Sequence, residues 1–301
     1  MSKTLIETLK ERVLVSDGAM GTQLMAAGLE SGNSGELWNL THPERVLEIQ
    51  RRYVASGSNC IITNTFGGNG LMMRRHGHFD QLAEINQAAV KIARQAFDGQ
   101  EGFVFGDVGP VGGVMEPYGD LKAEDVREGV RIQIQSLVEA GVDAIIIETQ
   151  TALEEIALGV EAAKAYGAPC IIASLAYDKS HDGTFFRTMM GVSPEKAAEE
   201  LTDMGVDVLA LNCGTGIDMN VAREIIEEYK DSSDAFTMAQ PNAGLPVLEN
   251  LKAVYKQTPD EMVSSLDALL EAGVNIVGGC CGSNPDHIRA IRQKVDAWNA
   301  R

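Results

Sequence analysis

Three cysteines fall at the ends of short apolar segments, where their thiol groups could bind a soft metal ion. Cys280 and Cys281 follow the run 274–279, and Cys213 follows the run 209–212. Zinc binds thiolate sulfur and prefers four tetrahedral ligands, and catalytic zinc sites keep one position open for a substrate. If the two segments end at the same place in the fold, we predict a three-thiolate zinc site suited to activating a substrate thiol.

Free cysteine is also common as a small buried hydrophobic side chain. That is our interpretation of Cys60 and Cys170, which lie inside apolar runs. The strand-end positions of the other three, and the glycines around them, favour metal binding instead. The five cysteines form no disulfide-like pattern, so we expect them to be reduced.

A pattern that recurs four times predicts the elements that position these cysteines. A glycine follows a helix-like segment, and two residues later Asn59, Asp143, Asp207 or Asn275 precedes an apolar run. Glycine adopts the left-handed conformation past a helix end at low cost, and short runs that are apolar throughout are typical of buried parallel strands. The predicted strands are 60–63, 144–147, 208–211 and 276–277, with four more at 12–15, 103–106, 170–173 and 235–238.

Helical patterns separate the predicted strands. Eight such βα units in 301 residues predict one (β/α)8 barrel spanning residues 1–301. The alternative is a doubly wound open sheet, which usually has about five or six strands. Four helices begin at a proline that follows a potential capping residue, namely His42, Ser193, Thr258 or Asn284. The predicted helices are 43–56, 82–97, 124–140, 153–165, 194–204, 219–229, 259–272 and 285–298.

Barrel enzymes place their chemistry at the C-terminal ends of the strands, and acidic side chains fall there in this chain. Asp17 begins a glycine-containing loop that lets the backbone approach a small ligand. Glu148 ends an apolar strand, where an unpaired carboxylate is costly. Each could bind the ammonium group of an amino acid, and each could instead cap a helix or pair with an arginine. We interpret Asp107 as a structural loop acid.

Histidine is absent from the predicted strand ends, so we expect no histidine ligand to the metal. We interpret all five histidines as surface or capping residues: His42, His76, His78, His181 and His287.

The net charge of −18, from 43 acidic and 25 basic residues, argues against nucleic acid or an anionic membrane surface as a partner. No apolar run approaches the roughly 18–20 residues of a membrane span. The first residues contain no signal-peptide core. Together with the reduced cysteines, these features predict a cytoplasmic protein.

The chain resembles the homocysteine S-methyltransferase family from about Val13 to Ala290. The resemblance implies a (β/α)8 barrel enzyme that transfers a methyl group to the thiol of homocysteine and so produces methionine. The motifs that match are Asp17–Thr22, Asn64–Phe66, Ile147–Thr149, Leu211–Cys213, Pro241–Pro246 and Gly278–Gly282.

This resemblance assigns roles to individual residues. Asp17 and Glu148 match the homocysteine-binding acids, and Asn242 is expected to fill the fourth zinc position until substrate arrives. A thiol on zinc is deprotonated without a general base, which agrees with the absence of histidine from the strand ends. The zinc ligands implied are Cys213, Cys280 and Cys281, and further substrate-binding candidates from the same motifs are Gly18, Thr22 and Asn64.

Members of the family use a methyl-corrinoid, S-methylmethionine or betaine as the methyl donor. Betaine users resemble one another in carrying tyrosine where this chain has Gly67 and Thr149. Only Trp38 is then left as an aromatic wall for a quaternary ammonium group, which disfavours betaine.

Segments 64–66, 116–120 and 241–246 look most like the homocysteine module of cobalamin-dependent methionine synthase. The chain ends at Arg301, after the predicted barrel. We therefore expect a methyl-corrinoid on a separate protein that docks at the barrel mouth. The alternatives are S-methylmethionine or betaine as donor, another thiol as acceptor, or a non-catalytic thiol-binding subunit.

Overall fold

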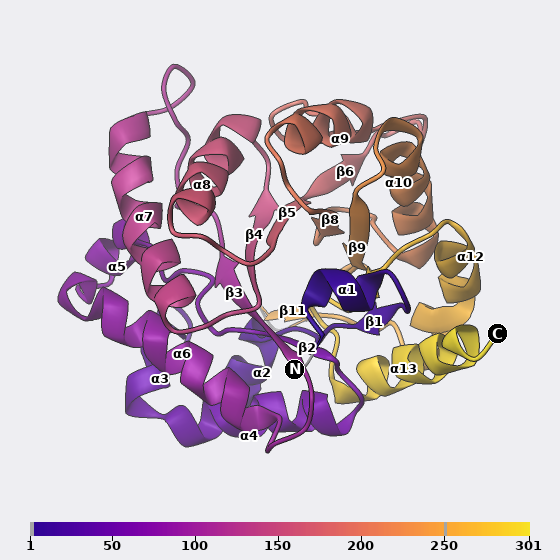
Figure 1. Ribbon diagram of the computed structural model, residues 1–301, viewed down its shortest axis with the longest axis horizontal. Helices are drawn as coiled ribbons and strands as arrows, with labels where there is room; N and C mark the ends of the chain where they lie inside the picture. The colour runs from indigo at the N-terminus through magenta and orange to yellow at the C-terminus, as the bar shows by residue number, and fades with distance from the viewer. Residues whose placement is uncertain (1–2, 250–251) are drawn as a thin grey trace.

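Eight parallel strands form a central sheet that curls into a barrel, with helices around the outside (Figure 1). The computed structural model describes residues 3–249 and 252–301. The strand order is β1-β12-β9-β8-β5-β4-β3-β2, so the chain passes once around the barrel. This confirms the predicted (β/α)8 fold. The strands are β1 (Leu14–Val15), β2 (Cys60–Ile62), β3 (Phe103–Val108), β4 (Ala144–Gln150), β5 (Ile171–Leu175), β8 (Val208–Asn212), β9 (Phe236–Gln240) and β12 (Ile276–Val277).

The helices outside the barrel follow the predicted segments, with one exception. Segment 259–272 is broken into two α-helices joined by a 3-10 turn. Side chains of Ser193, Thr258 and Asn284 cap their helices as predicted, whereas His42 makes no capping hydrogen bond. The helices are α4 (Pro43–Ala55), α6 (Leu82–Ala96), α7 (Ala123–Glu139), α8 (Leu153–Ala165), α9 (Pro194–Asp203), α10 (Met219–Ser232), α11 (Pro259–Met262), η2 (Val263–Ser265), α12 (Leu266–Glu271) and α13 (Pro285–Asn299).

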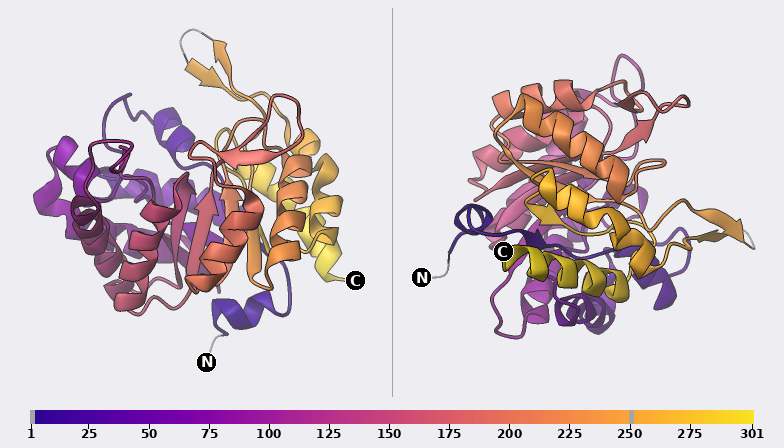
Figure 2. Two further views of the ribbon diagram at one scale, coloured as in Figure 1. Left: turned by 90° about the horizontal axis from the view of Figure 1, so that it is seen from above. Right: turned by 90° about the vertical axis from the view of Figure 1, so that its right-hand side faces the viewer.

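Short elements that the sequence pattern did not predict cover the two ends of the barrel. Helix α1 and the β10–β11 hairpin lie at opposite ends (Figure 2). The remaining short elements lie in connections that follow strand ends. These additional elements are α1 (Leu5–Leu9), α2 (Gly21–Ala26), α3 (Trp38–Thr41), α5 (Gly70–Arg75), η1 (Phe79–Gln81), β6 (Tyr177–Lys179), β7 (Phe186–Thr188), β10 (Val247–Glu249) and β11 (Lys252–Val254).

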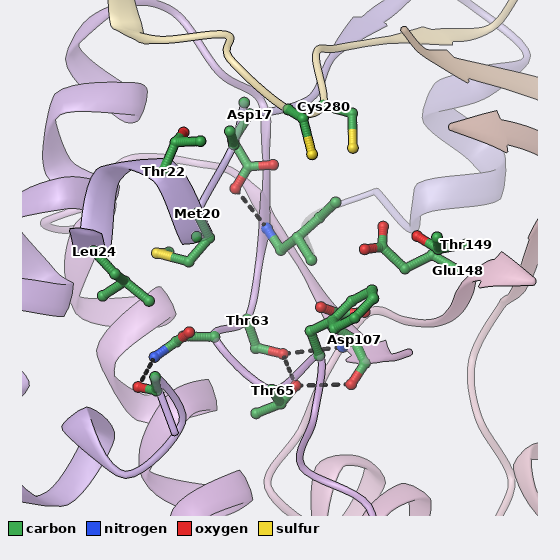
Figure 3. A pocket seen from close by; sticks show the side chains of 18 of the residues that line it. Asp17, Met20, Thr22, Leu24, Thr63, Thr65, Asp107, Glu148, Thr149 and Cys280 are labelled. Atoms are coloured by element: carbon green, nitrogen blue, oxygen red, sulfur yellow. Dashed lines mark hydrogen bonds between the residues drawn. The ribbon is translucent and has the colours of Figure 1, made fainter. Parts of the chain in front are cut away.

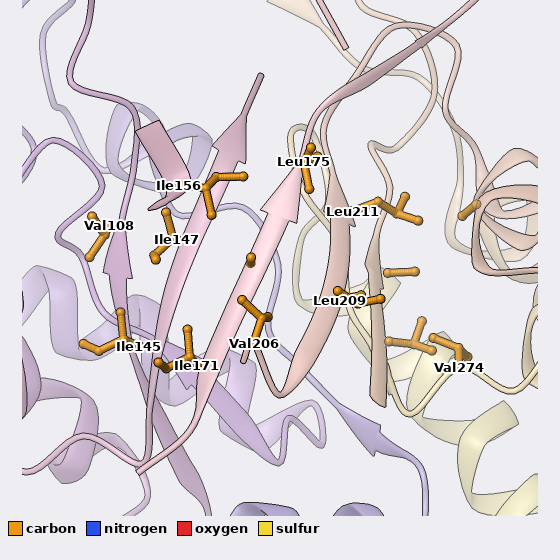
Figure 4. Packing of buried hydrophobic residues seen from close by; sticks show 14 of the residues in the cluster. Val108, Ile145, Ile147, Ile156, Ile171, Leu175, Val206, Leu209, Leu211 and Val274 are labelled. Carbon is orange, nitrogen blue, oxygen red and sulfur yellow. The ribbon is translucent and has the colours of Figure 1, made fainter. Parts of the chain in front are cut away.

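Alternate residues of each strand pack into two separate hydrophobic clusters. On β4, Ile145 and Ile147 belong to the large cluster between strands and helices (Figure 4), whereas Ala144 and Ile146 point into the barrel. The inner cluster also contains Leu5 and Leu9 of α1, which seals the end of the barrel where the strands begin, here called the lower end. The barrel interior is therefore filled with side chains below the strand ends, and any cavity must lie above them.

The recurring glycine-x-Asx pattern has a structural role that its sequence did not reveal. Each Asx side chain accepts a hydrogen bond from the backbone N–H of the first or second residue of the barrel strand that precedes it in the chain. Asp143 accepts from Val104 at 2.7 Å, and Asp207 accepts from Ile171 at 2.8 Å. Asn275 accepts from Thr237 at 2.9 Å, and Asn59 accepts from Val15 at 3.1 Å. Four pairs of strands are thus held in register at the lower end of the barrel.

The barrel closes between β1 and β2 through individual hydrogen bonds; within the described residues these two strands form no regular ladder. Asn59 N donates to Val15 O at 2.7 Å at the lower end. At the upper end, Asp17 Oδ2 accepts from Ile62 N at 2.9 Å. An acidic side chain of the predicted site therefore also closes the barrel.

Across residues 3–249 and 252–301, every helix is too short or too polar to cross a bilayer.

Replacing Asp207 with alanine should destabilise the barrel, because Ile171 N would be left buried without an acceptor. We expect Asp207→Ala to lower the free energy of unfolding by about 1–3 kcal/mol in urea denaturation. Asp207→Asn keeps an oxygen acceptor and should retain most of the stability. Equal stability of all three proteins would show that this hydrogen bond does not hold the register.

Candidate metal and substrate site

A cavity of about 370 Å³ opens at the C-terminal ends of the strands (Figure 3). Residues in or just after the C-terminal ends of β1, β2, β3, β4, β8, β9 and β12 reach its wall, so distant parts of the chain meet there. Its size falls within the usual range for a small-molecule site. Of the predicted site residues, all but one line this cavity: Asp17, Gly18, Thr22, Asn64, Glu148, Cys213, Cys280 and Cys281.

The three predicted ligand cysteines lie together, because β8 and β12 both pair with β9, where Leu211 and Val277 are each level with Ala239. Their Sγ atoms all lie within 4.8 Å of one another, and the sulfurs of Cys213 and Cys281 are 3.9 Å apart. Tetrahedral zinc with bonds of about 2.3 Å requires sulfurs about 3.8 Å apart. The observed spacing therefore fits zinc. Cys60 and Cys170 are buried in the barrel interior, as predicted, and burial raises the pKa of each.

The three clustered thiols share protons through hydrogen bonds. Hydrogen bonds from Cys213 and Cys280 lower the pKa of Cys281 to about 3. Hydrogen bonds to Cys213 and Cys281, together with burial, raise the pKa of Cys280. One thiolate is thus stabilised by two thiols, and a metal ion that takes all three sulfurs must displace the remaining protons.

Asn242 lies beside the cysteines but does not line the cavity. Its Nδ2 donates to Gly214 O at 3.2 Å, and the next residue, Ala243, bonds through its backbone to Cys281 O. Asn242 Oδ1 is buried without a hydrogen-bond partner. A buried oxygen without a partner, one residue before a backbone contact with Cys281, is compatible with the fourth zinc ligand that we expected.

Carboxylates surround the cavity without a compensating base (Figure 3). Asp17, Glu36, Asp107 and Glu148 all line it, and no described residue of the lining is lysine or arginine. Burial raises the pKa of Asp17 to about 8. Burial and the Cys281 charge raise the pKa of Glu148 to about 7. Such a cavity is suited to a positively charged ligand, which would restore the carboxylates to their charged form.

Asp107 is not the structural loop acid that we expected. It is the second-last residue of β3, is buried, and its Oδ1 has no partner. Its backbone N–H is held by Thr63 Oγ1, which in turn contacts Thr65 (Figure 3). Gln240 Oε1 and Thr22 Oγ1 are likewise buried in the lining without partners. Residues of the cavity wall therefore carry three buried oxygens without hydrogen-bond partners.

A bulge near the end of β4 brings Glu148 to the cavity. The pairing of β4 with β5 shifts between Ile147 and Gln150, so one residue is unpaired there. Thr149 has a φ of 59°, which is unusual for a β-branched residue and costs on the order of 1–3 kcal/mol. Cys213 has a similar φ of 57°. Such strained backbone persists only where surrounding contacts hold it, and both residues contact or adjoin Asn212.

The three remaining candidates play different parts. A Cβ on Gly18 would lie 2.7 Å from Ser283 Oγ and 2.9 Å from the Tyr53 ring, so only glycine fits there. Thr22 lines the cavity, and its hydroxyl oxygen is buried without a hydrogen-bond partner. The Asn64 amide is occupied, because its Nδ2 donates to Gly35 O at 2.8 Å and to Asn39. Asn64 therefore shapes the wall instead of offering its NH2 group to a ligand.

The aromatic residues of the site differ from the prediction. Trp38 is buried, packs against His42 and Arg45, and does not line the cavity. Phe66 is the aromatic residue of the described lining, and it is half-exposed at the mouth. Phe66 belongs to a motif that the sequence singled out, but its exposure could not be foreseen from that motif.

Tyr255 was missed entirely. Its ring lies against Gly282, where a Cβ would come within 2.1 Å of it, and Gly282 has a φ of 79°. Burial and the neighbouring Cys281 raise the pKa of Tyr255. Tyr255 follows the β10–β11 hairpin, so no local pattern links it to the cysteines.

One histidine lies elsewhere than the sequence predicted. Among the described residues, the group with metal-ligand spacing contains cysteines only. His287, expected at the surface or in a cap, is buried between Asn284 and the carbonyl of Gln257. It therefore ties the start of α13 to the segment before α11.

Comparison with known proteins gives a consistent result. A family model described as homocysteine S-methyltransferase matches residues 14–295. Methionine synthase of Mycobacterium leprae (strain TN) is 33% identical over 315 residues, which cover 98% of this chain and 25% of that protein. Methionine synthase of Mycobacterium tuberculosis (strain ATCC 25618 / H37Rv) is 32% identical over 311 residues, with 97% and 25% covered. The chain thus spans about a quarter of the length of these curated relatives.

Solved structures agree on the fold. The crystal structure of the homocysteine methyltransferase MmuM from Escherichia coli in its metallated form matches with a TM-score of 0.77 at 22% identity, covering 96% of this chain and 99% of that one. The apo form matches with a TM-score of 0.72 at 23% identity, covering 97% and 98%.

The raised pKa of Asp17 predicts a pH-dependent stability. The folded protein holds this proton up to about pH 8, whereas the ordinary value is 3.8. The stabilisation is therefore complete below about pH 4 and is lost as the pH rises toward 8. We expect Asp17→Asn, which keeps an acceptor for Ile62 N and does not titrate, to lose less stability than the native protein between pH 4 and pH 8.

Urea denaturation between pH 4 and 8, without metal or ligand, measures this effect. Asp120→Asn, at an exposed position, is the matched control and should keep the native pH slope. An identical slope for Asp17→Asn and the native protein would contradict the prediction.

Proposed function

Because the chain belongs to the homocysteine S-methyltransferase family, we propose that it is a zinc-dependent enzyme that methylates homocysteine to methionine. The methyl donor we propose is a methyl-corrinoid held by protein outside these 301 residues. One observation supports this more than any other. Three thiols with the spacing of tetrahedral zinc ligands border an acidic cavity that contains no basic side chain among its described lining.

The residues present fit zinc by number, spacing and chemistry. Cys213, Cys280 and Cys281 would hold it, and the unpaired Oδ1 of Asn242 would complete the site until substrate arrives. When bound, zinc lowers the pKa of a thiol that enters its open position, so that the sulfur is nucleophilic at neutral pH.

The carboxylates of Asp17 and Glu148 bind the ammonium group of homocysteine. Asp17 Oδ2 accepts from Ile62 N and Oδ1 accepts from Ser16 Oγ at 3.4 Å, so the orientation of this carboxylate in the cavity wall is fixed. A cation between the two would lower both pKa values, which burial has raised to about 8 and about 7. Thr22 Oγ1 and the Asp107 carboxyl are the further polar contacts that we propose.

The donor must reach the substrate from the mouth, because the barrel below is filled by the inner hydrophobic cluster. Exposed large hydrophobic residues gather on the connections around that mouth. They follow β2, β3, β5 and β9, and include Phe66, Tyr118, Met189 and Leu248. An apolar rim of this kind marks a protein interaction surface, and we propose that a corrinoid-carrying protein binds it.

The site gives less support to betaine as the donor. Recognition of a quaternary ammonium group requires aromatic faces around it. Phe66 is the single aromatic side chain in the described lining, and Trp38 lies elsewhere. A partner-held donor is therefore the better fit.

We further propose that residues 1–301 act as one domain in the cytoplasm. The strands, the outer helices and the site form one barrel without an internal division. Three free thiols lying this close would be prone to oxidation outside a reducing compartment.

Zinc content tests the metal site directly. Protein purified under reducing conditions should contain about one zinc per chain by elemental analysis. Zinc-edge absorption should show three sulfur ligands, and a fourth after homocysteine is added. Cys281→Ser should lose both zinc and methyl transfer, whereas Cys170→Ala, which alters a buried thiol outside the site, should keep both. Full activity of a zinc-free protein would refute the proposed mechanism.

Methyl transfer from different donors tests the corrinoid proposal. With methylcobalamin, S-methylmethionine and betaine supplied separately, we expect methionine to form from the corrinoid alone. Leu248→Glu should slow transfer from a protein-bound corrinoid, because it places a charge on the apolar rim, and should leave transfer from free methylcobalamin unchanged. Methionine formed from betaine or S-methylmethionine without a corrinoid would rule the proposal out.

A further inference from the structure

Asn212 is a buried side chain that touches both halves of the site without lining the cavity. It is the last residue of β8, directly before Cys213, and only 1% of it is exposed. Its carboxamide hydrogen bonds reach β4, β5 and the cysteine pair after β12.

The carboxamide oxygen and nitrogen of Asn212 each make two hydrogen bonds. Asn212 Oδ1 accepts from Thr149 N at 3.0 Å and from Ser174 Oγ at 2.6 Å. Asn212 Nδ2 donates to Thr149 Oγ1 at 2.7 Å and to Cys280 Sγ at 3.8 Å. A primary amide offers two donors and two lone pairs, so no common side chain of this size could make the same set.

The contacts with Thr149 explain how the β4 bulge is kept. Thr149 holds a positive φ, and Asn212 binds it through both backbone and side chain. Glu148 immediately precedes it, so the direction of that carboxylate depends on the turn. The fourth contact places a donor against Cys280, one of the three clustered thiols.

We propose that Asn212 is a positioning residue that fixes the Glu148–Thr149 turn relative to Cys280. Glu148, which would bind the ammonium group of the substrate, and Cys280, which would hold the metal for its thiol group, are then kept at a fixed distance from each other. The inference rests on the proposed function, because it assumes that a metal binds the cysteines. A hydrogen bond to a ligand sulfur also withdraws electron density from it, which tunes the metal site. Changes to such outer partners typically weaken metal binding about 10–100-fold.

Co(II) is the probe for the metal half of the site, because its sulfur charge-transfer bands report on each thiolate. Asn212→Leu should weaken Co(II) binding about 10–100-fold in competition with a chelator and shift the charge-transfer bands to lower energy. It should also weaken homocysteine binding, measured by calorimetry on the Co(II) protein.

Two further variants separate positioning from general stability. Thr149→Val keeps the Nδ2 contact with Cys280 but loses the Oγ1 contact, so homocysteine binding should weaken about fivefold while the Co(II) spectrum is unchanged. Ser174→Ala removes a hydrogen bond of the same amide on the side away from the cysteines. It should lower the melting temperature and leave both affinities and the spectrum unaltered.

If Asn212→Leu does not fold, Thr149→Val and Ser174→Ala still decide the question. Native-like Co(II) spectra and homocysteine affinity in both Asn212→Leu and Thr149→Val would overturn the inference. Equal losses in Thr149→Val and Ser174→Ala would overturn it too, since they would indicate a merely structural amide. Failure of the native protein to bind Co(II) would instead overturn the proposed function.

Discussion

A cluster of negative charge without a basic side chain is the constraint on which the rest of this site depends. Four carboxylates and three thiols meet above the filled barrel, and the described lining contains no lysine or arginine. A folded chain can tolerate such a cluster only if protons or bound cations neutralise it. The raised pKa values of Asp17 and Glu148 show the first solution, and a zinc ion with an amino-acid ammonium group would supply the second.

The barrel holds these acidic and thiol side chains in place through hydrogen bonds at both ends of its strands. At the lower end, Asx side chains hold four strand pairs in register, so the upper ends arrive at set heights. At the upper end, Asp17 closes β1 onto β2 and Asn212 links β4, β5 and the cysteine pair. Hydrogen bonds between polar groups therefore fix the geometry of the site, whereas hydrophobic packing fixes the barrel wall.

Much of this architecture could be predicted because its causes are local. Continuous apolar runs and the glycine-x-Asx pattern locate all eight strands, and strand ends locate the three cysteines. The break at Val263–Ser265 and the two hairpins depend on tertiary packing, which helical periodicity cannot report. The roles of Tyr255 and Asn212 were not predicted for the same reason, since they arise from contacts with distant residues. The burial of Trp38 and the exposure of Phe66 likewise depend on how the connections fold over the mouth.

The filled interior and the α1 seal close the barrel below the cavity, and the described lining opens at the mouth. In the proposed reaction, a donor protein bound to the rim would cover that opening. Homocysteine would then have to enter before the donor binds, and methionine could leave only after the donor departs. Turnover would follow a compulsory order, and a tightly bound, demethylated carrier would slow release of product even when the chemical step is fast.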